Sequence, residues 1–280
     1  MAKRRLDALL AERGLFSSRS RAAASVMAGE VRVGPGERRA SKPGELVDAE
    51  ERVSVAERPA FVSRGGIKLA NALDAWELDV RGRRALDVGA STGGFSDCLL
   101  QRGARDVIAV DVGYGSLAWS LRNDPRVSVM ERCNARELTP QMLPHAPDLA
   151  VVDVSFISLA KVLGAVLGCL AGGYDVLALV KPQFEVGRGR VGKGGVVRDA
   201  DDRRAALVAV GEAALALGTA VLGYRSSGLP GPKGNCETFV WLADPARLDG
   251  ADRAPEAILP QSGDGDPALR LARLARGVEP

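Results

Sequence analysis

The chain has 280 residues, 46% hydrophobic and 26% charged, so it can hold one large domain or two smaller ones around a substantial core. The formal net charge is only +3, but residues 1–42 hold ten Lys and Arg against four Asp and Glu, a local charge of +6. The basic excess therefore lies in the N-terminal segment, where it favours a polyanionic partner.

Several classes of protein are disfavoured by the sequence. The cysteines Cys98, Cys133, Cys169 and Cys236 are scattered, with no C-x-x-C pair and no histidine cluster, which argues against a zinc site or a disulfide framework. The start, MAKRRLDALLAERG, lacks the apolar region of a signal peptide, and the longest apolar stretch, 162–171, is about half of what a membrane span needs. We expect a cytoplasmic protein that does not enter a membrane and binds no metal.

Residues 1–57 are predicted to form a small α+β module. RRLDALLAERG has leucines at the spacing of a short amphipathic helix that Gly14 ends, and SRSRAAASVMAG follows as a second helix capped by Ser17 or Ser18. VRV and ERVSVAE then alternate like short strands. Arginines on the polar helix faces suit RNA binding, with an ordinary solvated surface as the alternative.

Residues 63–246 follow a short linker, 58–62, and are predicted to form an α/β domain. Apolar strands such as RRALDVGA, DVIAVDVG, PDLAVVDV and YDVLALVK alternate with helical segments, which is typical of a parallel sheet covered on both faces. TAVLGYR and CETFVWL have only a loop between them, so we expect them to pair antiparallel at one edge. The tail, 247–280, is rich in Pro, Gly and Asp, and we expect it to be disordered apart from a helical stub at ALRLARLARG.

A glycine-rich turn, DVGASTGGF, lies between the first strand of this domain and its helix, where a ligand can approach the backbone closely. Its spacing differs from the G-x-G-x-x-G of dinucleotide folds, and it lacks the Lys-Ser/Thr of a P-loop. The acid before the first glycine can reach a cationic amine, so the turn suits S-adenosylmethionine (SAM); a plain tight turn is the alternative. The predicted cofactor-binding residues are Asp87, Gly89, Ala90, Ser91, Thr92, Gly93, Gly94 and Phe95, with Asp111 for the ribose and Asn134 for the adenine edge or as a loop cap.

Four charged residues are expected to meet near this turn. In LALVKPQFEVG an apolar strand stops at Lys181, although lysine is rarely buried, and Asp153 ends the preceding strand. Since α/β sheets carry their chemistry at the carboxyl ends of the strands, both side chains should face the same crevice as the glycine turn. Glu237 opens the antiparallel last strand at the same edge, and Lys68 lies on the helix IKLANALDAW. For each residue taken alone, a surface salt bridge is the alternative.

Two lysines and two carboxylates above a methyl donor suit the methylation of a sugar hydroxyl. The hydroxyl is a poor nucleophile, and a lysine can take its proton when burial and a second cation favour the neutral amine. We expect Lys181 to act as the base, with Lys68, Asp153 and Glu237 as orienting and electrostatic partners. Most of the rate would come from positioning.

The same stretches carry a family resemblance. The residues that carry it are SRGGIKL (63–69), DVGASTGGFSD (87–97), DVGYGSLAWSLRNDPRV (111–127), DVSFISL (153–159), LVKPQFEVGRGRVGKGGVVRD (179–199) and LPGPKGNCETF (229–239). They resemble the TlyA family of ribosomal RNA 2′-O-methyltransferases, some of which are named hemolysins. The resemblance implies an S4-like RNA-binding domain followed by a Rossmann-like, SAM-dependent methyltransferase domain, with a seven-stranded, mostly parallel sheet and an antiparallel last strand. It also implies a Lys-Asp-Lys-Glu tetrad at Lys68, Asp153, Lys181 and Glu237.

The substrate implied by the resemblance is the 2′-hydroxyl of cytidine in ribosomal RNA, in the 16S RNA, the 23S RNA or both, within ribosomal subunits. This methylation supports sensitivity to antibiotics such as capreomycin and viomycin. A full N-terminal domain goes with members that modify both subunits, which we favour, and we expect a monomer. The family linker reads Arg-any-Trp-Val, whereas here it is RPAFV at 58–62, one residue longer and with Phe for Trp.

Basic residues near the N-terminus and in the loop FEVGRGRVGKGGVVRD are predicted to contact RNA phosphates, although a solvated loop is the alternative. The predicted RNA-binding residues are Arg4, Arg5, Arg19, Arg21, Arg64, Arg188, Arg190 and Lys193. Three other functions stay open on the sequence: a membrane-active toxin, a non-catalytic RNA-binding protein and a SAM enzyme acting on small molecules.

Overall fold

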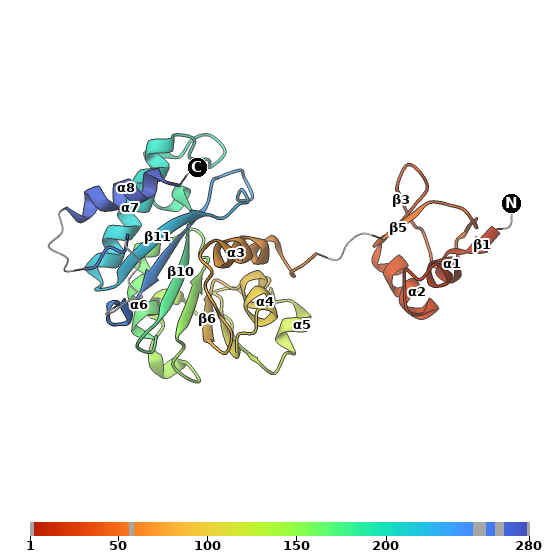
Figure 1. The fold of residues 1–280 in the computed structure, drawn as a ribbon, viewed down its shortest axis with the longest axis horizontal. Helices are drawn as coiled ribbons and strands as arrows, with labels where there is room; N and C mark the ends of the chain where they lie inside the picture. The colour runs from red at the N-terminus through yellow and green to blue at the C-terminus, as the bar shows by residue number, and fades with distance from the viewer. Residues whose placement is uncertain (1–2, 56–58, 249–255, 261–265, 279–280) are drawn as a thin grey trace. The chain divides into compact units, whose positions relative to one another are not determined.

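The computed structural model describes residues 3–55, 59–248, 256–260 and 266–278. The chain divides into two compact units, residues 1–60 and 61–280, which Figure 1 draws as ribbons. Each unit has a hydrophobic core of its own. Each unit is therefore a domain in the physical sense.

The N-terminal unit is the small α+β module expected from the sequence. α1 and α2 pack over a core that includes Leu6 and Leu10. The Ser18 hydroxyl caps α2 by accepting a hydrogen bond from the backbone N–H of Arg21 (3.2 Å), and Gly29 ends the helix at φ +77°, where glycine is favoured. The sequence did not indicate the short strands β1, β3 and β4. The elements are β1 (Lys3–Arg5), α1 (Leu6–Glu12), α2 (Arg19–Ala28), β2 (Val31–Val33), β3 (Arg38–Arg39), β4 (Leu46–Asp48) and β5 (Val53–Val55).

The second unit is built on a seven-stranded sheet with the order β11-β12-β10-β9-β6-β7-β8. Neighbouring strands from β10 to β8 are parallel, whereas β12 is antiparallel to both β10 and β11, which confirms the predicted fold class and its antiparallel edge. The strands are β6 (Arg84–Val88), β7 (Asp106–Val110), β8 (Val127–Met130), β9 (Leu149–Val152), β10 (Asp175–Val180), β11 (Ala220–Ser226) and β12 (Thr238–Ala243).

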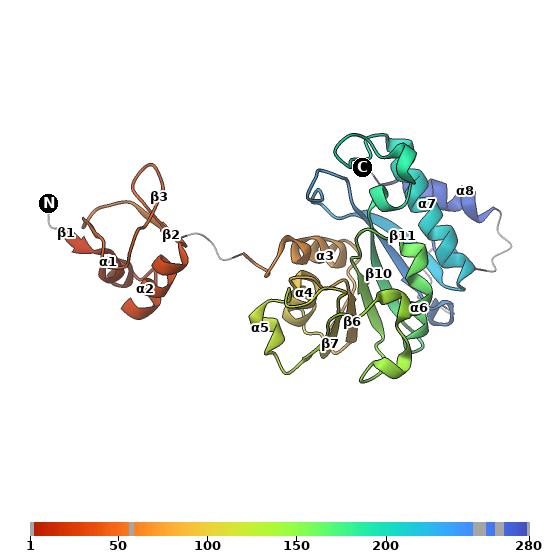
Figure 2. The same ribbon diagram turned by 180° about the vertical axis from the view of Figure 1, so that it is seen from behind.

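Helices cover both faces of this sheet, as Figures 1 and 2 show from opposite sides. Side chains alternate along the strands: Ala150 and Val152 of β9 join the core under α6, α7 and α8, whereas Leu149 and Val151 join the core under α3 and α4. The two faces therefore have separate cores with β9 between them. The helices are α3 (Arg64–Ala75), α4 (Gly94–Gln101), the four-residue α5 (Trp119–Arg122), α6 (Leu163–Gly168), α7 (Ala200–Ala216) and α8 (Pro267–Arg276).

The prediction of a disordered tail is wrong at residues 256–260, whereas α8 confirms the helical stub predicted at ALRLARLARG. Ile258 pairs with Val221 of the edge strand β11 through two backbone hydrogen bonds. α8 packs on α7 and buries Leu271 and Ala275, since its apolar residues recur at helical spacing. The composition of the tail therefore does not indicate that Ile258 pairs with the sheet edge or that α8 packs on α7. Residues 249–255, 261–265 and 279–280 lie outside the described residues.

The linker expected at 58–62 ends inside the second unit. The Phe61 ring lies so close to Gly66 of α3 that a Cβ at that glycine would be 2.3 Å from the ring. The backbone N–H of Val62 donates to Asp97 Oδ2 (2.8 Å), which fixes the chain at the start of α3. Phe61 therefore packs against α3, at the position where the linker pattern expected from the resemblance has Trp. Arg58 lies outside the described residues.

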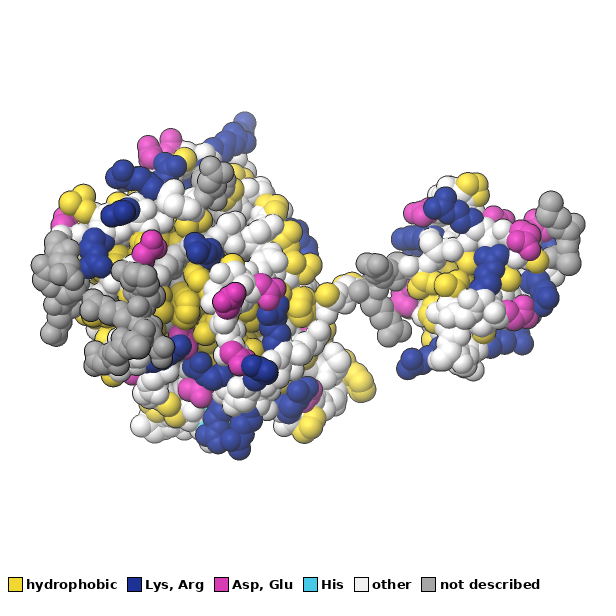
Figure 3. Space-filling view, viewed as in Figure 1, with side chains coloured by type: hydrophobic (Ala, Val, Ile, Leu, Met, Phe, Trp, Pro, Cys, Tyr) yellow, Lys and Arg dark blue, Asp and Glu magenta, His cyan; other side chains and the backbone are white. Residues whose placement is uncertain are grey.

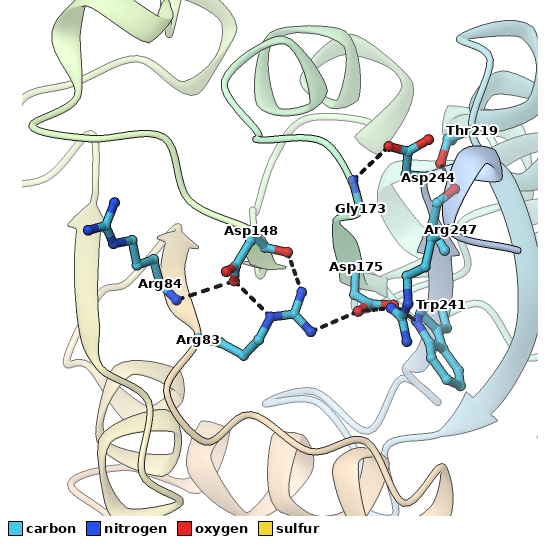
Figure 4. A network of polar contacts seen from close by, with 10 residues as sticks. Arg83, Arg84, Asp148, Gly173, Asp175, Thr219, Trp241, Asp244 and Arg247 are labelled. Atoms are coloured by element: carbon cyan, nitrogen blue, oxygen red, sulfur yellow. Dashed lines mark hydrogen bonds and ion pairs between the residues drawn. The ribbon is translucent and has the colours of Figure 1, made fainter. Parts of the chain in front are cut away.

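A buried polar network ties the strands together at the edge of the sheet where β6 and β10 begin (Figure 4). Asp175 is completely buried, accepts from Arg83 (3.0 Å) and Trp241 (2.8 Å), and forms an ion pair with Arg247. Arg83 also contacts Asp148 (2.7 Å). One carboxylate thus joins β6, β10, β12 and the turn after β12.

We expect Asp175→Ala to lower the free energy of unfolding of the second unit by about 3 kcal/mol, because it leaves Arg83 and the Trp241 indole without their partner. Unfolding in urea, followed by tryptophan fluorescence, measures this, since all three tryptophans lie in that unit. The control is Asp79→Ala, which removes an exposed ion pair with Arg81 and should cost much less stability. Equal losses in the two variants would contradict the role given to Asp175.

Candidate active site

Two ion pairs lie side by side at the carboxyl edge of the sheet. Lys68 of α3 pairs with Glu237, and Lys181, after β10, has its Nζ 2.6 Å from Asp153 Oδ1. The Ser155 hydroxyl also contacts Lys181 Nζ, at 2.9 Å. Lys68 and Glu237 are almost fully buried, whereas the Asp153 side chain keeps 25% of its surface exposed. The structure therefore brings together all four residues of the predicted tetrad.

The strand pairing explains this convergence. Val180, the last residue of β10, lies opposite Thr238, the first residue of β12, so Lys181 and Glu237 flank the same point of the sheet. Likewise Val88 of β6 lies beside Val152 of β9, which sets the glycine turn next to Asp153. Parallel and antiparallel strands thus deliver residues far apart in the chain to one edge.

A cavity of about 410 Å³ joins the tetrad to the glycine turn. The turn approaches Asp153 so closely that a Cβ at Gly89, whose φ is +86°, would lie 2.4 Å from the Asp153 carbonyl oxygen. Only glycine fits there, and the group that approaches it is the Asp153 backbone, whereas the sequence predicted the close approach of a ligand. The lining residues are Ser63, Arg64, Gly65, Lys68, Asp87, Gly89, Ala90, Ser91, Thr92, Gly94, Phe95, Asp153, Lys181, Pro230, Pro232 and Glu237.

Asp87 supplies a buried carboxylate at the wall of this cavity. Its Oδ2 accepts from the backbone N–H (2.9 Å) and the hydroxyl (2.6 Å) of Ser96 on α4. Its Oδ1 is buried and has no hydrogen-bond partner within the described ranges. Burial, helped by the nearby carboxylates of Asp153 and Asp111, raises the pKa of Asp87 to about 7 against the opposing Ser96 hydrogen bonds. An acid in this state fits the cationic end of SAM, which would relieve its unpaired oxygen.

Three predicted cofactor-binding residues have structural contacts and are not among the cavity's lining residues. Asp111 holds the glycine turn, because Oδ2 accepts from Ser91 N–H (2.7 Å). Asn134 caps the 3-10 helix η1 (Ala135–Glu137), the loop-capping alternative given above. At Gly93, φ is +97° and a Cβ would lie 2.2 Å from Leu121, so this glycine serves the packing of the turn.

The N-terminal arginines predicted to bind RNA differ in how they are held. Arg4 forms an ion pair with an acid of α1, while Arg5 and Arg19 both contact the buried carboxylate of Asp7. Arg21 is exposed and forms no ion pair with any described residue. In Figure 3, Lys and Arg side chains are spread over the visible face of this unit among Asp and Glu.

The predicted RNA-binding residues of the second unit lie on loops. Arg64 lines the cavity and donates to the Pro230 carbonyl (2.9 Å). Arg190 pairs with an acid at the start of α7 (3.4 Å). Arg188 and Lys193 are exposed, and neither forms an ion pair within the part of the chain that the structure describes.

Sequence reasoning missed an aromatic pair beside the tetrad. Phe156 is 92% exposed, adopts φ +65°, and lies 5.2 Å from the Phe184 ring, centroid to centroid. Both rings belong to stretches, DVSF and KPQF, that directly follow the strands ending at Asp153 and Lys181. An aromatic residue three positions after each strand-end charge was the signal that could have found them.

Among the described residues, no group of three or more His, Cys, Asp or Glu side chains could hold a metal ion. None of the helices that the structure describes has the length and apolar character needed to cross a bilayer.

Comparison with known proteins gives the family. Residues 61–244 match the FtsJ-like methyltransferase family and residues 4–53 match the S4 domain. The chain is 53% identical to the 16S/23S rRNA (cytidine-2′-O)-methyltransferase TlyA of Mycobacterium tuberculosis, over 86% of this chain and 91% of that protein. It is 44% identical to YqxC of Bacillus subtilis, named as a candidate rRNA methyltransferase, over 91% and 90% of the two chains.

A solved structure agrees with these matches. A candidate hemolysin from Streptococcus thermophilus is 39% identical, aligns over 99% of this chain and 97% of its own, and superposes with a TM-score of 0.68. The methyl donor of the FtsJ-like domain is SAM, and the glycine turn with Asp87 fits it. The chain belongs to the TlyA family, in which an S4 domain precedes an FtsJ-like methyltransferase domain.

Proposed function

We propose that the protein transfers a methyl group from SAM to the 2′-hydroxyl of cytidine in ribosomal RNA. The observation that carries this proposal is the convergence of two Lys–carboxylate pairs on one cavity with the glycine turn. The rRNA (cytidine-2′-O)-methyltransferase activity named for the Mycobacterium tuberculosis relative supports the choice of substrate. Methylation at such cytidines would make the ribosome sensitive to capreomycin and viomycin.

In this proposal the tetrad prepares a sugar hydroxyl for attack. SAM, held by the glycine turn and by Asp87, supplies an activated methyl group. Lys181 would accept the hydroxyl proton as the oxygen bonds to the methyl carbon and the methyl–sulfur bond breaks, which leaves the cofactor as a neutral thioether. Asp153, whose Oδ1 is 2.6 Å from Lys181 Nζ, holds the lysine in place. The pair Lys68–Glu237 fixes the floor of the cavity, so most of the rate comes from positioning.

The N-terminal unit would dock the enzyme on folded RNA in a ribosomal subunit, in the cytoplasm. Its match to the S4 domain and its basic surface support this role. Arg188 and Lys193, on an exposed loop near the active-site strand β10, would contact phosphates beside the target nucleotide. Because residues 4–53 match the S4 domain, we favour action on both subunits, by a monomer.

Lys181→Met should lower the rate of ribose methylation at least 100-fold, because no other group accepts the hydroxyl proton. Methyl transfer from labelled SAM to isolated ribosomal subunits, followed by mapping of the ribose methylation, measures this. SAM affinity should stay within about threefold of the unmodified protein. The control is Lys161→Met, at an exposed lysine outside the cavity, which should keep full activity. Retained methylation in Lys181→Met would refute the assignment of the base.

SAM binding should release a proton near pH 7 and weaken as the pH falls. Below about 7 the buried Asp87 carboxyl is mostly protonated and must lose its proton to face a cation, so acid opposes binding. Calorimetric titration in buffers of different ionisation enthalpy counts the released protons. Asp87→Asn should remove the release and flatten the pH dependence between about 6 and 8. A proton count that Asp87→Asn leaves unchanged would assign the titration to another group.

Arg21→Glu should weaken binding to ribosomal subunits several-fold and reduce the salt dependence of binding, since an exposed cation that meets a phosphate releases a counterion. Filter binding over a range of KCl concentrations measures both effects. Arg276→Glu, at an exposed position of α8, serves as the matched control for the change in net charge. If the two variants bind equally well, α2 does not contact the RNA.

A further inference from the structure

A second cavity, of about 440 Å³, opens directly beside the first. The two share Lys181, Pro232 and Glu237, so a group in the second cavity lies next to the proposed base. Its walls carry aromatic, amide and glycine residues, a lining suited to a flat ring with polar edges. The lining residues are Ser155, Phe156, Lys181, Gln183, Phe184, Val191, Gly195, Gly231, Pro232, Lys233, Asn235 and Glu237.

Phe156 gives this cavity an unusual aromatic wall. Phe156 is 92% exposed and adopts φ +65°. Neither burial of the ring nor the backbone preference of a non-glycine residue stabilises this conformation. Its ring rests on Phe184, which itself lies on the 3-10 helix η4 (Pro182–Phe184) after the base. A strained, exposed ring beside an active site is the arrangement that a stacked nucleobase would stabilise.

Gln183 adds an unused polar group to the same wall. Its Oε1 is shielded from water and has no hydrogen-bond partner within the described ranges. The other amide of the cavity, Asn235, is fully engaged: Oδ1 accepts from Val197 N–H (2.9 Å), and Nδ2 donates to the Gly195 carbonyl (2.8 Å). Gln183 is therefore the side-chain amide of this cavity that is left to bond a ligand.

We propose that Gln183 reads the base of the target nucleotide, a specificity role that rests on the proposed function. The Gln183 oxygen would accept a hydrogen bond from the exocyclic N4 amine of a cytosine stacked on Phe156, and the amide N–H would donate to N3 of that ring. Uracil presents a carbonyl at the position of the amine, so it would face the Gln183 oxygen with a second acceptor. The oxygen has no partner among the described residues of the free protein, so a rotation of the Gln183 amide toward the incoming base would give this buried acceptor the hydrogen bond that it lacks.

The test combines a protein change with a base change. Single-turnover methylation is measured for the full chain and for Gln183→Leu, on RNA with cytidine or with 2-pyrimidinone riboside, which lacks the amine, at the target site. Removing the amine or the amide alone should slow methylation by about 10- to 100-fold. For Gln183→Leu, removing the amine from the RNA should slow methylation no further than about twofold, because this variant has already lost the hydrogen bond to the amine.

This role of Gln183 would be overturned if the losses of methylation rate from the two changes were additive. It would also be overturned if the unmodified protein methylated the RNA without the amine as fast as the RNA with cytidine. The second comparison needs no variant, so it stands even if Gln183→Leu fails to fold. Gln141→Leu, at an exposed glutamine outside both cavities, should behave like the unmodified protein on both RNAs. An unmodified protein that methylates no ribosomal cytidine would instead refute the proposed function, so the two failures are distinct.

Discussion

The antiparallel pairing of β12 with β10 is the constraint on which the active site depends. If β12 ran parallel to its neighbour, Glu237 would open the strand at the far edge of the sheet, well away from Lys181. With Val180 opposite Thr238, the residue that ends one strand and the residue that begins the other share one edge. A shift of one residue would turn the inward side chains of β12 to the other face, so the two apolar cores also hold the active-site geometry in register.

Charge balance explains how such a site can be buried. Lys68 and Glu237 retain 9% and 1% of their side-chain exposure, and either charge alone would be costly at that depth. Their ion pair makes the cavity floor neutral, and the second pair, Lys181–Asp153, does the same at the more open side. At the opposite edge, Asp175 holds the strands through Arg83 and Trp241, so stability and chemistry occupy different ends of the same sheet.

The sequence predicted the elements whose signals are local. The alternation of apolar strands with helices predicted the parallel sheet, and the charges at strand ends indicated Lys181 and Asp153 as site residues. It failed where composition and packing disagree: the Pro- and Gly-rich tail conceals the pairing of Ile258 with β11, and the spacing that predicted a helix at α8 does not reveal its packing on α7. The side-chain contacts of Asp111 with the glycine turn and of Asn134 with η1 are not determined by spacing along the chain.

Three buried polar atoms without partners among the described residues and one exposed aromatic ring lie together at the carboxyl edge of the sheet. Asp87 Oδ1, Gln183 Oε1 and Glu237 Oε1 are buried without hydrogen-bond partners in the described structure, and Phe156 is exposed at a positive φ. Each of these residues lines one of two adjoining cavities that meet at Lys181. A stable core has no use for such groups, whereas a site for two substrates needs them unpaired until the substrates arrive. Their common location follows from the sheet, because the strand ends are where backbone pairing stops and side chains become free to bind something else.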